Sequence, residues 1–400
     1  MIVVFATPAM GHTKPMIPIL AGLVANGCRI VCFGHKAFEG VIRSSGAEFR
    51  AYPDVAYNID APDFNLLRMG ADLIQASEII YPQLLPQVAE LHPNLILQDF
   101  MALWASRIGT TLDIARIHTV PTLVFNRPTQ RKMRKEDGIA KLAKDVFYGS
   151  PALARALVRS RFAVSIQEAY GVERSWRRLR PPIAELVFNI KELQVGDLEA
   201  GVPRHYIGPT INEARHHEPP AARGYALITF GTLSNNETGR FEAAMRGAVM
   251  GGFSVVVQCG RKVNLDHLQK LAKTLAAEHP GKTVTVLDSV TDMEVLIMGA
   301  DVVIHHAGMA TTWETVRYAK PALFIPTIAD QKVFASQLEK RGFGVRLPRG
   351  REFDPRAIAQ GLRSAMNRHY DWPQLQGLVA RARGAPRGVE IILDALRAGR

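Results

Sequence analysis

The chain has 400 residues, of which 47% are hydrophobic and 22% are charged, and its formal net charge is +12 at pH 7. This is the composition of an ordinary soluble globular protein, and the length exceeds what one hydrophobic core usually supports, so we expect two domains. No run of 18 apolar residues occurs, and we therefore expect no membrane-spanning helix.

The N-terminal segment Met1–Thr7 is apolar but has no basic start, so we expect a strand there rather than a signal peptide. Three cysteines, Cys28, Cys32 and Cys259, lie in apolar runs, in an odd number and without the spacing of metal ligands. We therefore expect neither a disulfide framework nor a zinc site, and we expect the protein to be cytoplasmic.

Short apolar runs alternate with helix-length amphipathic segments along the whole chain, a pattern that predicts an α/β fold with parallel sheets covered by helices. Strands are expected in the first half at Ile2–Thr7, Arg29–Phe33, Ala47–Tyr52, Asn94–Gln98 and Ile114–Thr119. In the second half they are expected at Tyr225–Phe230, Ser254–Gln258, Thr283–Leu287, Asp301–Ile304 and Pro321–Pro326.

A polar, proline-rich segment at residues 208–222 separates the two halves and is expected to be a linker. The chain then has a Rossmann-like domain at 1–207, a second one at 223–370 and a last helix within 371–400, expected to cross back to the first domain. With a strand order of 3-2-1-4-5, each sheet reverses direction between its first and fourth strands, and a ligand crevice opens there.

His12 and Asp99 are both expected at the crevice of the first domain, because they follow its first and fourth strands. A histidine oriented by a carboxylate on one ring nitrogen can accept a proton on the other, so the pair is a candidate general base. The alternatives are that His12 caps or packs a helix and that Asp99 is the N-cap of the segment Phe100–Arg107.

The segment from His306 to Glu314 follows the fourth strand of the second domain and places small residues at a helix start. Unpaired N–H groups and the helix dipole make such a start suitable for a diphosphate. Thr311 and Glu314 also have the spacing of a capping box, and both interpretations stay open. Asp330 and Gln331 open another helix, either as an ordinary helix start or as ligands of sugar hydroxyls.

These motifs resemble the donor-binding signature of family 1 glycosyltransferases, and the bacterial natural-product and macrolide enzymes are the most similar. The matching landmarks are Gly11-His12-x-x-Pro15, Asp99, Phe230-Gly231-Thr232, His306-x-Gly308 and Asp330-Gln331. The resemblance implies the GT-B architecture, in which two Rossmann-like domains face each other across a central cleft. It further implies inverting transfer of a sugar from a UDP- or dTDP-sugar to a hydroxyl of a small acceptor, with His12 as base and Asp99 assisting.

The resemblance also implies roles for the donor-binding positions. They are Gly231, Thr232, His306, Gly308, Ala310 and Thr311 for the diphosphate, Glu314 for the ribose, Asp330 and Gln331 for the sugar, and Ser289 and Val290 for the nucleobase. Three residues depart from the family pattern: Ser289 replaces a ring that stacks on the base, Ala307 replaces a glycine, and Ala310 stands where a glycine or a polar contact is common. An apolar acceptor is expected to bind at Phe64, Leu67, Met69 and Trp104.

No Asp-x-Asp triplet occurs in the chain, so we expect no cofactor and no metal requirement. The segment from Arg127 to Arg180 holds fourteen lysines and arginines against five acidic residues, so +9 of the net +12 lies there. It is either the solvated face of amphipathic helices or a contact for an anionic membrane surface or an acidic acceptor. It lacks regular aromatic interleaving, and we expect no nucleic-acid partner.

Three other functions fit the same sequence pattern. They are a membrane-associated glycosyltransferase with a lipid or sterol-type acceptor, a nucleotide-sugar epimerase or hydrolase, and a non-catalytic auxiliary protein on the same fold. The presence of both His12 and Asp99 favours an enzyme over the auxiliary protein.

Overall fold

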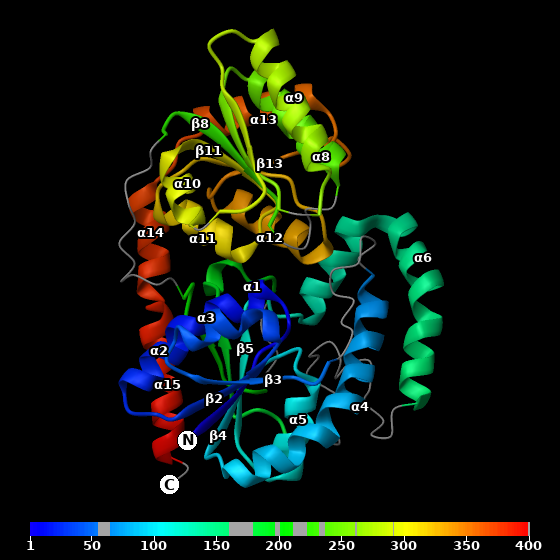
Figure 1. Cartoon of the computed structure of the whole chain (residues 1–400), viewed down its shortest axis with the longest axis vertical. Coiled ribbons are helices and arrows are strands. Elements are labelled where there is room, and N and C mark those ends of the chain that lie inside the picture. The colour runs from blue at the N-terminus through cyan, green and yellow to red at the C-terminus, as the bar shows by residue number, and fades with distance from the viewer. Residues whose placement is uncertain are drawn as a thin grey trace. The chain divides into compact units, whose positions relative to one another are not determined.

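The computed structural model of the chain describes residues 1–54, 65–159, 179–196, 201–210, 222–231, 237–260, 262–290 and 292–398. The chain divides into two compact units: unit 1 comprises Met1–Ile211 and Val379–Arg400, and unit 2 comprises Asn212–Leu378. Each unit is built on one sheet of parallel strands with helices packed against it (Figure 1).

The sheet of unit 1 has seven strands in the order β3-β2-β1-β4-β5-β6-β7. The strands are β1 (Ile2–Phe5), β2 (Ile30–Gly34), β3 (Glu48–Ala51), β4 (Leu95–Asp99), β5 (Arg116–Val120), β6 (Ala184–Val187) and β7 (Arg204–Tyr206). The central strand β1 is apolar at every position because both faces of the sheet are covered. Ile2 and Val4 belong to the core on one face, and Val3 and Phe5 belong to the core on the other.

The helices of unit 1 divide between these two faces. They are α1 (Met10–Thr13), α2 (Ile17–Ala25), α3 (Glu39–Arg43), α4 (Leu66–Leu91), α5 (Leu103–Thr111), α6 (Arg127–Arg159) and α15 (Gly384–Ala398), with 3-10 turns at Lys14–Met16, Lys36–Phe38 and Lys191–Leu193. Helices α2 and α15 contribute to the first core, and α4 and α5 to the second. Helix α6 is interrupted by a kink at Gly138, where φ is 78°.

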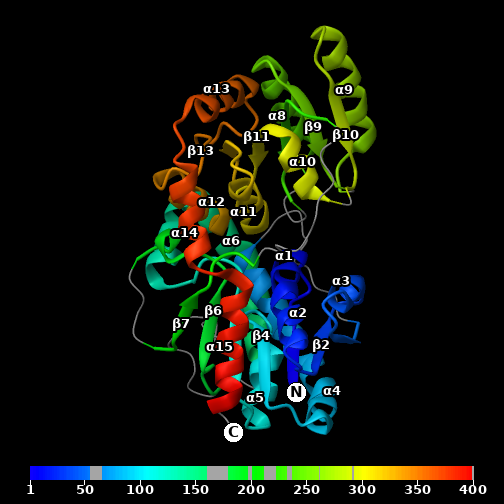
Figure 2. The ribbon, with the colours of Figure 1, turned by 90° about the vertical axis from the view of Figure 1, so that its left-hand side faces the viewer.

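The last helix of the chain, α15, belongs to unit 1 although it follows unit 2 in sequence. Its residues Val389 and Ile392 pack into the same core as Ile19 and Leu23 of α2. The contact is close, since a Cβ on Gly22 would lie 2.7 Å from Val389 Cγ2. Figure 2 shows α15 running along the sheet of unit 1.

The sheet of unit 2 has six strands in the order β10-β9-β8-β11-β12-β13. The strands are β8 (Tyr225–Thr229), β9 (Ser254–Gln258), β10 (Val284–Leu287), β11 (Ala300–His305), β12 (Ala322–Phe324) and β13 (Val345–Arg346). The helices are α8 (Thr238–Met250), α9 (Leu265–Glu278), α10 (Met293–Gly299), α11 (Met309–Arg317), α12 (Ala329–Lys340) and α13 (Pro355–Asn367), followed by α14 (Trp372–Arg381). Residues of α8, α9 and α13 form the main core with one face of the sheet, and α10 packs on the other.

The predicted α/β fold and the strand order 3-2-1-4-5 are confirmed in both units. The strands β6 and β7 of unit 1 and the edge strand β13 of unit 2 were not predicted. The single last helix predicted within 371–400 is wrong: there are two helices, α14 and α15, because Arg383 and Gly384 adopt positive φ between them.

Most of the predicted linker at 208–222 lies outside the described residues, and the facing of the two crevices stays a prediction. In the ranges that the structure describes, we find no helix that is both long and apolar enough to cross a bilayer.

The packing of α15 generates a stability prediction. Ile392→Ala removes a fully buried side chain from the core shared with α2, so it should lower the free energy of unfolding by about 2–5 kcal/mol. Urea denaturation followed by fluorescence measures the change. The control is Arg397→Ala on the same helix, whose side chain is 73% exposed and should cost less than about 0.5 kcal/mol. Equal effects of the two substitutions would contradict the packing described here.

Candidate active site

His12 and Asp99 lie together at the carboxyl end of the unit 1 sheet. Asp99 is the last residue of β4, and His12 lies in α1 just after β1, the strand beside β4 (Figure 1). His12 Nδ1 is 2.9 Å from Asp99 Oδ2. An ionised carboxylate only accepts hydrogen bonds, so Nδ1 carries the proton and Nε2 presents a lone pair. The side chain of Asp99 is fully buried, whereas that of His12 is 15% exposed, so the imidazole is not sealed from an approaching ligand.

The second oxygen of Asp99 is held by two further donors. The hydroxyl of Thr7 donates to Oδ1 at 2.7 Å, and the backbone N–H of Met101 donates to the same oxygen at 2.9 Å. Hydrogen bonds to an ionised acceptor are stronger than neutral ones, so these contacts fix the orientation of the carboxylate. The alternative role of Asp99 as a helix N-cap is not supported, because α5 begins at Leu103 and its N-cap is Ala102.

Two phenylalanine rings line one side of the imidazole of His12. The ring of Phe100 stacks on that of His12 with centroids 5.9 Å apart, and Phe125 lies 5.9 Å from Phe100. Phe100 also packs against a buried apolar cluster, and Leu67 and Met69 of α4 pack against the same cluster. Neither Phe100 nor Phe125 was predicted as a site residue, although Phe100 directly follows Asp99 in the sequence.

The predicted acceptor-binding residues have different outcomes. Leu67 and Met69 are partly buried and pack against the same apolar cluster as Phe100, and their contact with an acceptor stays a prediction. The prediction for Trp104 is wrong: its side chain is fully buried and packs edge-on against Tyr52, because α5 turns this position toward the sheet. Phe64 lies outside the described residues.

In unit 2, His306 follows β11 and is packed between two glycines. Its side chain is nearly buried, and the structure gives its Nδ1 no hydrogen-bond partner among the described residues. A Cβ on Gly231 would lie 2.6 Å from the imidazole Cε1, and one on Gly308 would lie 2.3 Å from Nε2. Both positions therefore require glycine. The imidazole that they accommodate has a buried Nδ1 close to the start of α11.

Burial and, to a lesser extent, the nearby guanidinium of Arg240 lower the pKa of His306 to about 4, and a hydrogen bond with the backbone of Thr229 opposes them. His306 is thus neutral at physiological pH and has one N–H to donate. Arg240 itself is buried on α8, forms an ion pair with Glu237, and its Nε finds no hydrogen-bond acceptor in the described part of the chain. Arg240 was not predicted as a site residue, because its position near His306 depends on packing between distant segments.

Helix α11 begins with Gly308 as its N-cap, and no side chain caps it. Its first turn has no acidic residue, so the N–H groups and the dipole of this end are not compensated from within that turn. Thr311 is the third residue of the helix and not the N-cap, so the capping-box interpretation of Thr311 and Glu314 is wrong. The arrangement at Met309, Ala310 and Thr311 is suited to bind an anion.

The turn before α11 is conformationally strained at Ala307, which adopts φ of 60° without being a glycine. His305 supports this turn: its Nδ1 accepts a hydrogen bond from the Ala307 N–H at 3.2 Å, and its ring packs edge-on against Phe324. Burial lowers the pKa of His305 to about 3, which keeps Nδ1 an acceptor. His305 was not among the predicted site residues, although it is adjacent to His306.

The remaining predicted donor residues are near other ends of strands and helices in unit 2. Gln331 is buried, and its Oε1 accepts hydrogen bonds from the N–H and hydroxyl of Thr327 and from the N–H of Ile328. The carbonyl oxygen of this side chain is thus occupied by groups at the start of α12. Its NH₂ group is the part that can donate to a ligand. Asp330 is half-buried and Glu314 is buried. The hydroxyl of the exposed Ser289 donates to Asp288 at 3.1 Å.

Two further predicted contacts complete the placement. Val290 is half-buried, and Thr232 lies outside the described residues. Among the residues that the structure describes, no group of three or more His, Cys, Asp or Glu side chains is placed to hold a metal ion.

Comparisons with known proteins point to one class of enzyme. Residues 236–371 match the glycosyltransferase family 28 C-terminal domain. The chain is 23% identical over 351 residues to NDP-glycosyltransferase YjiC of Bacillus subtilis (strain 168), covering 86% of this chain and 83% of that protein.

Two solved structures share the fold of the whole chain. The glycotransferase of kitacinnamycin is 20% identical and has a TM-score of 0.75, covering 99% of this chain and 98% of that one. The glycosyltransferase VinC in complex with dTDP is 16% identical and has a TM-score of 0.63, covering 100% and 99% of the two chains.

The low pKa of His306 generates a prediction about stability and pH. In the unfolded chain a histidine titrates near pH 6.5, so between about pH 6.5 and 4 the unfolded chain binds a proton that folded unit 2 does not. The free energy of unfolding should therefore fall as the pH is lowered through this window, and His306→Gln should make that fall shallower by up to about 1.4 kcal/mol per pH unit. Urea denaturation at pH 7, 6 and 5 measures it, with the exposed His369→Gln as the control. Identical slopes for wild type and His306→Gln would show that His306 is not buried as described.

Proposed function

This chain is a glycosyltransferase with the GT-B fold that resembles the natural-product enzymes of family 1, and we propose that it transfers a sugar, with inversion, from a nucleoside-diphosphate sugar to a hydroxyl of a small apolar acceptor. The observation that carries this proposal is the hydrogen bond between His12 Nδ1 and the buried Asp99 carboxylate. It leaves Nε2 as a proton acceptor at the sheet end where ligands bind in this class of fold.

In the proposed reaction, His12 Nε2 takes the proton of the acceptor hydroxyl while its oxygen attacks the anomeric carbon of the donor. The bond from that carbon to the diphosphate oxygen breaks on the opposite face, so the configuration inverts and the nucleoside diphosphate leaves with the bonding electrons. Asp99 balances the charge of the imidazolium that forms and does not itself take up the proton. General base catalysis of this kind typically contributes about 10² to 10⁴ in rate.

In this proposal the diphosphate binds at the start of α11. His306 donates from its imidazole, and the N–H groups of the first turn, from Gly308 to Thr311, point toward the phosphates. Arg240 supplies a full positive charge close enough to lower the pKa of His306. Gly231 allows the close approach of His306, and Thr232 is proposed to donate to a phosphate oxygen.

The ribose, the sugar and the base of the donor are proposed to bind to other residues of unit 2. Glu314 binds the ribose, Asp330 and the NH₂ group of Gln331 bind the sugar hydroxyls, and the backbone at Val290 meets the base, which Ser289 cannot stack upon. The nucleotide is UDP or dTDP, and the VinC structure, which holds dTDP, favours dTDP. Thermal-shift measurements with dTDP, UDP and their sugars test this assignment.

The acceptor is proposed to lie against Phe100, whose ring stacks on His12, with Phe125, Leu67 and Met69 extending the apolar surface. An aglycone that packs on this apolar surface with one hydroxyl near His12 would present the hydroxyl oxygen to His12 Nε2. Mass spectrometry detects the conjugate, and the anomeric coupling constant in proton NMR gives its configuration. Retention of configuration, or altered donor without any conjugate, would refute the proposed reaction.

The assignment of the base generates a kinetic prediction. His12→Gln keeps a side chain of similar length but has no basic nitrogen, so kcat should fall by about 10² to 10⁴ while the affinity for the nucleotide stays near that of the wild type. Steady-state kinetics and nucleotide titration measure the two quantities.

The matched control is His35→Gln, an exposed histidine at the end of β2 that should leave kcat unchanged. Transfer by His12→Gln at the rate of the wild type would remove His12 from the mechanism.

The composition of the anion site generates a prediction about metals. If the charge of Arg240, the dipole of α11 and the N–H of the neutral His306 together stabilise the diphosphate, transfer should proceed without Mg²⁺ or Mn²⁺, and an excess of EDTA should leave the initial rate unchanged. Initial rates with and without EDTA, on protein dialysed free of metal, measure this. Activity that disappears in EDTA and returns with Mn²⁺ would contradict the proposal.

A further inference from the structure

Helix α6 carries large apolar side chains on its outer surface. Among the large hydrophobic residues that the structure describes, the three most exposed are Val158 at 86%, Phe147 at 74% and Tyr148 at 64%, and all three lie on α6. The rings of Phe147 and Tyr148 pack edge-to-face on each other, with centroids 5.1 Å apart. An apolar surface of this kind usually marks a contact with something outside the chain.

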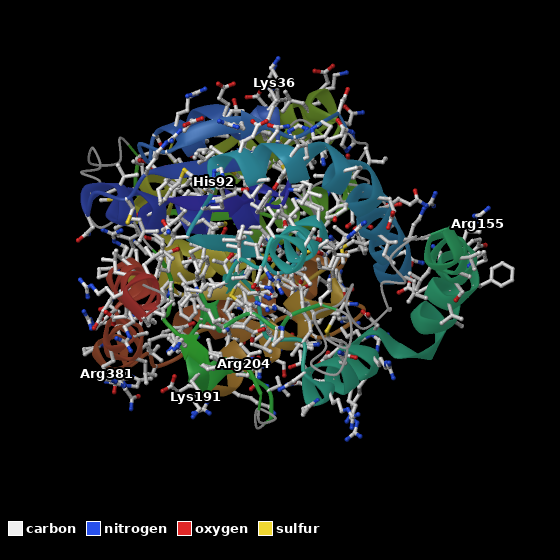
Figure 3. All side chains as sticks on the ribbon, turned by 90° about the horizontal axis from the view of Figure 1, so that it is seen from below. Lys36, His92, Arg155, Lys191, Arg204 and Arg381 are labelled. Carbon is white, nitrogen blue, oxygen red and sulfur yellow. The ribbon has the colours of Figure 1, made fainter. Side chains whose placement is uncertain are left out.

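These residues lie on one face of the helix together with two basic residues. A helix places residues that are three, four, eleven and fourteen positions apart on the same side. Counted from residue 144, these are residues 147, 148, 155 and 158. We call Lys144, Phe147, Tyr148, Arg155 and Val158 the α6 face. Figure 3 shows Arg155 on the part of α6 that forms the outer edge of unit 1 in that view.

The opposite side of α6 is fixed against unit 1. Leu153 and Ala156 are buried in a cluster with residues of α4, and a Cβ on Gly149 would lie 2.5 Å from Asn65 Oδ1. The amide of Asn65 also donates to the backbone oxygen of Asp145 at 3.0 Å. Since the inner side is packed this closely, α6 cannot rotate to bury the α6 face within unit 1.

The charge of α6 limits what the α6 face can contact. Between Arg127 and Arg159 there are nine lysines and arginines against three acidic residues. The exposed guanidinium of Arg155 donates to the backbone oxygen of Pro151, which leaves its charge uncompensated by that contact. Two copies of this chain meeting through α6 would bring like charges together, whereas an anionic surface would complement them.

We propose that the α6 face docks unit 1 on an anionic lipid bilayer. Phe147, Tyr148 and Val158 would enter the boundary between headgroups and acyl chains, and Lys144 and Arg155 would meet the lipid phosphates. Exposed aromatic and aliphatic side chains beside basic ones are the pattern of helices that lie on membrane surfaces. The proposal concerns a surface that takes no part in the proposed sugar transfer.

Co-sedimentation of the full chain with vesicles tests the proposal. The chain should pellet with phosphatidylglycerol–phosphatidylcholine vesicles at low ionic strength, less so at high salt, and not with phosphatidylcholine alone. Phe147→Ser with Val158→Ser should lower the partition coefficient at least about tenfold, because two apolar anchors are lost. Lys144→Glu with Arg155→Glu should lower it at least as much, because two favourable charges are reversed.

Two double variants of unit 1 serve as matched controls. Ile79→Ser with Ile183→Ser removes two other exposed apolar side chains, and Lys36→Glu with Lys191→Glu makes the same change in net charge elsewhere. Both should bind vesicles like the wild type. Circular dichroism and dTDP thermal shifts identify any variant that fails to fold, independently of lipid binding.

Three outcomes would overturn the proposal. The first is no sedimentation with anionic vesicles at low ionic strength, and the second is an equal loss of vesicle binding in the α6-face variants and their controls. The third is a dimer, seen by light scattering, that Phe147→Ser with Val158→Ser abolishes while vesicle binding is absent. The last outcome would assign the α6 face to a second copy of the chain.

Discussion

The buried carboxylate of Asp99 is the constraint on which the catalytic half of the structure depends. A charge removed from water is costly unless it is paired and hydrogen-bonded, and Asp99 meets this condition with three donors: the imidazole of His12, the hydroxyl of Thr7 and the N–H of Met101. Two of these donors follow β1, and Asp99 ends β4. They meet because β1 and β4 are adjacent and parallel, so the reversal of strand order creates the site.

The same topology in unit 2 produces a site in which the histidine has different surroundings. There β8 leads to Gly231 and β11 leads to His306, again on neighbouring strands. His12 donates a hydrogen bond to a carboxylate, whereas His306 is buried near the guanidinium of Arg240, and both burial and this charge favour its neutral form. The first environment suits a base that gains a proton during the reaction, and the second suits a donor to an anion. The two environments fit the two roles that sugar transfer from a diphosphate requires.

The sequence predicted the features that follow from strand order and failed where packing at longer range decides. Apolar runs predicted ten of the strands, and the switch point then paired His12 with Asp99. The strands β7 and β13 have only three and two residues, too few to show a pattern, and β6 was missed although three of its four residues are apolar. Trp104 was misplaced because residue type does not say which side of α5 faces the sheet. Arg240 and Phe125 reach their sites from distant segments, so no local motif identifies them.

The central claim is that Asp99 holds His12 in the tautomer with the proton on Nδ1 and none on Nε2. Long-range nitrogen–proton NMR of histidine-labelled protein near neutral pH reads this tautomer directly, with His12→Gln assigning the signal. We predict a protonated Nδ1 and an unprotonated Nε2 for His12, and loss of this preference in Asp99→Ala. A proton on Nε2 in the wild type, or the same tautomer with and without the Asp99 carboxylate, would contradict the account.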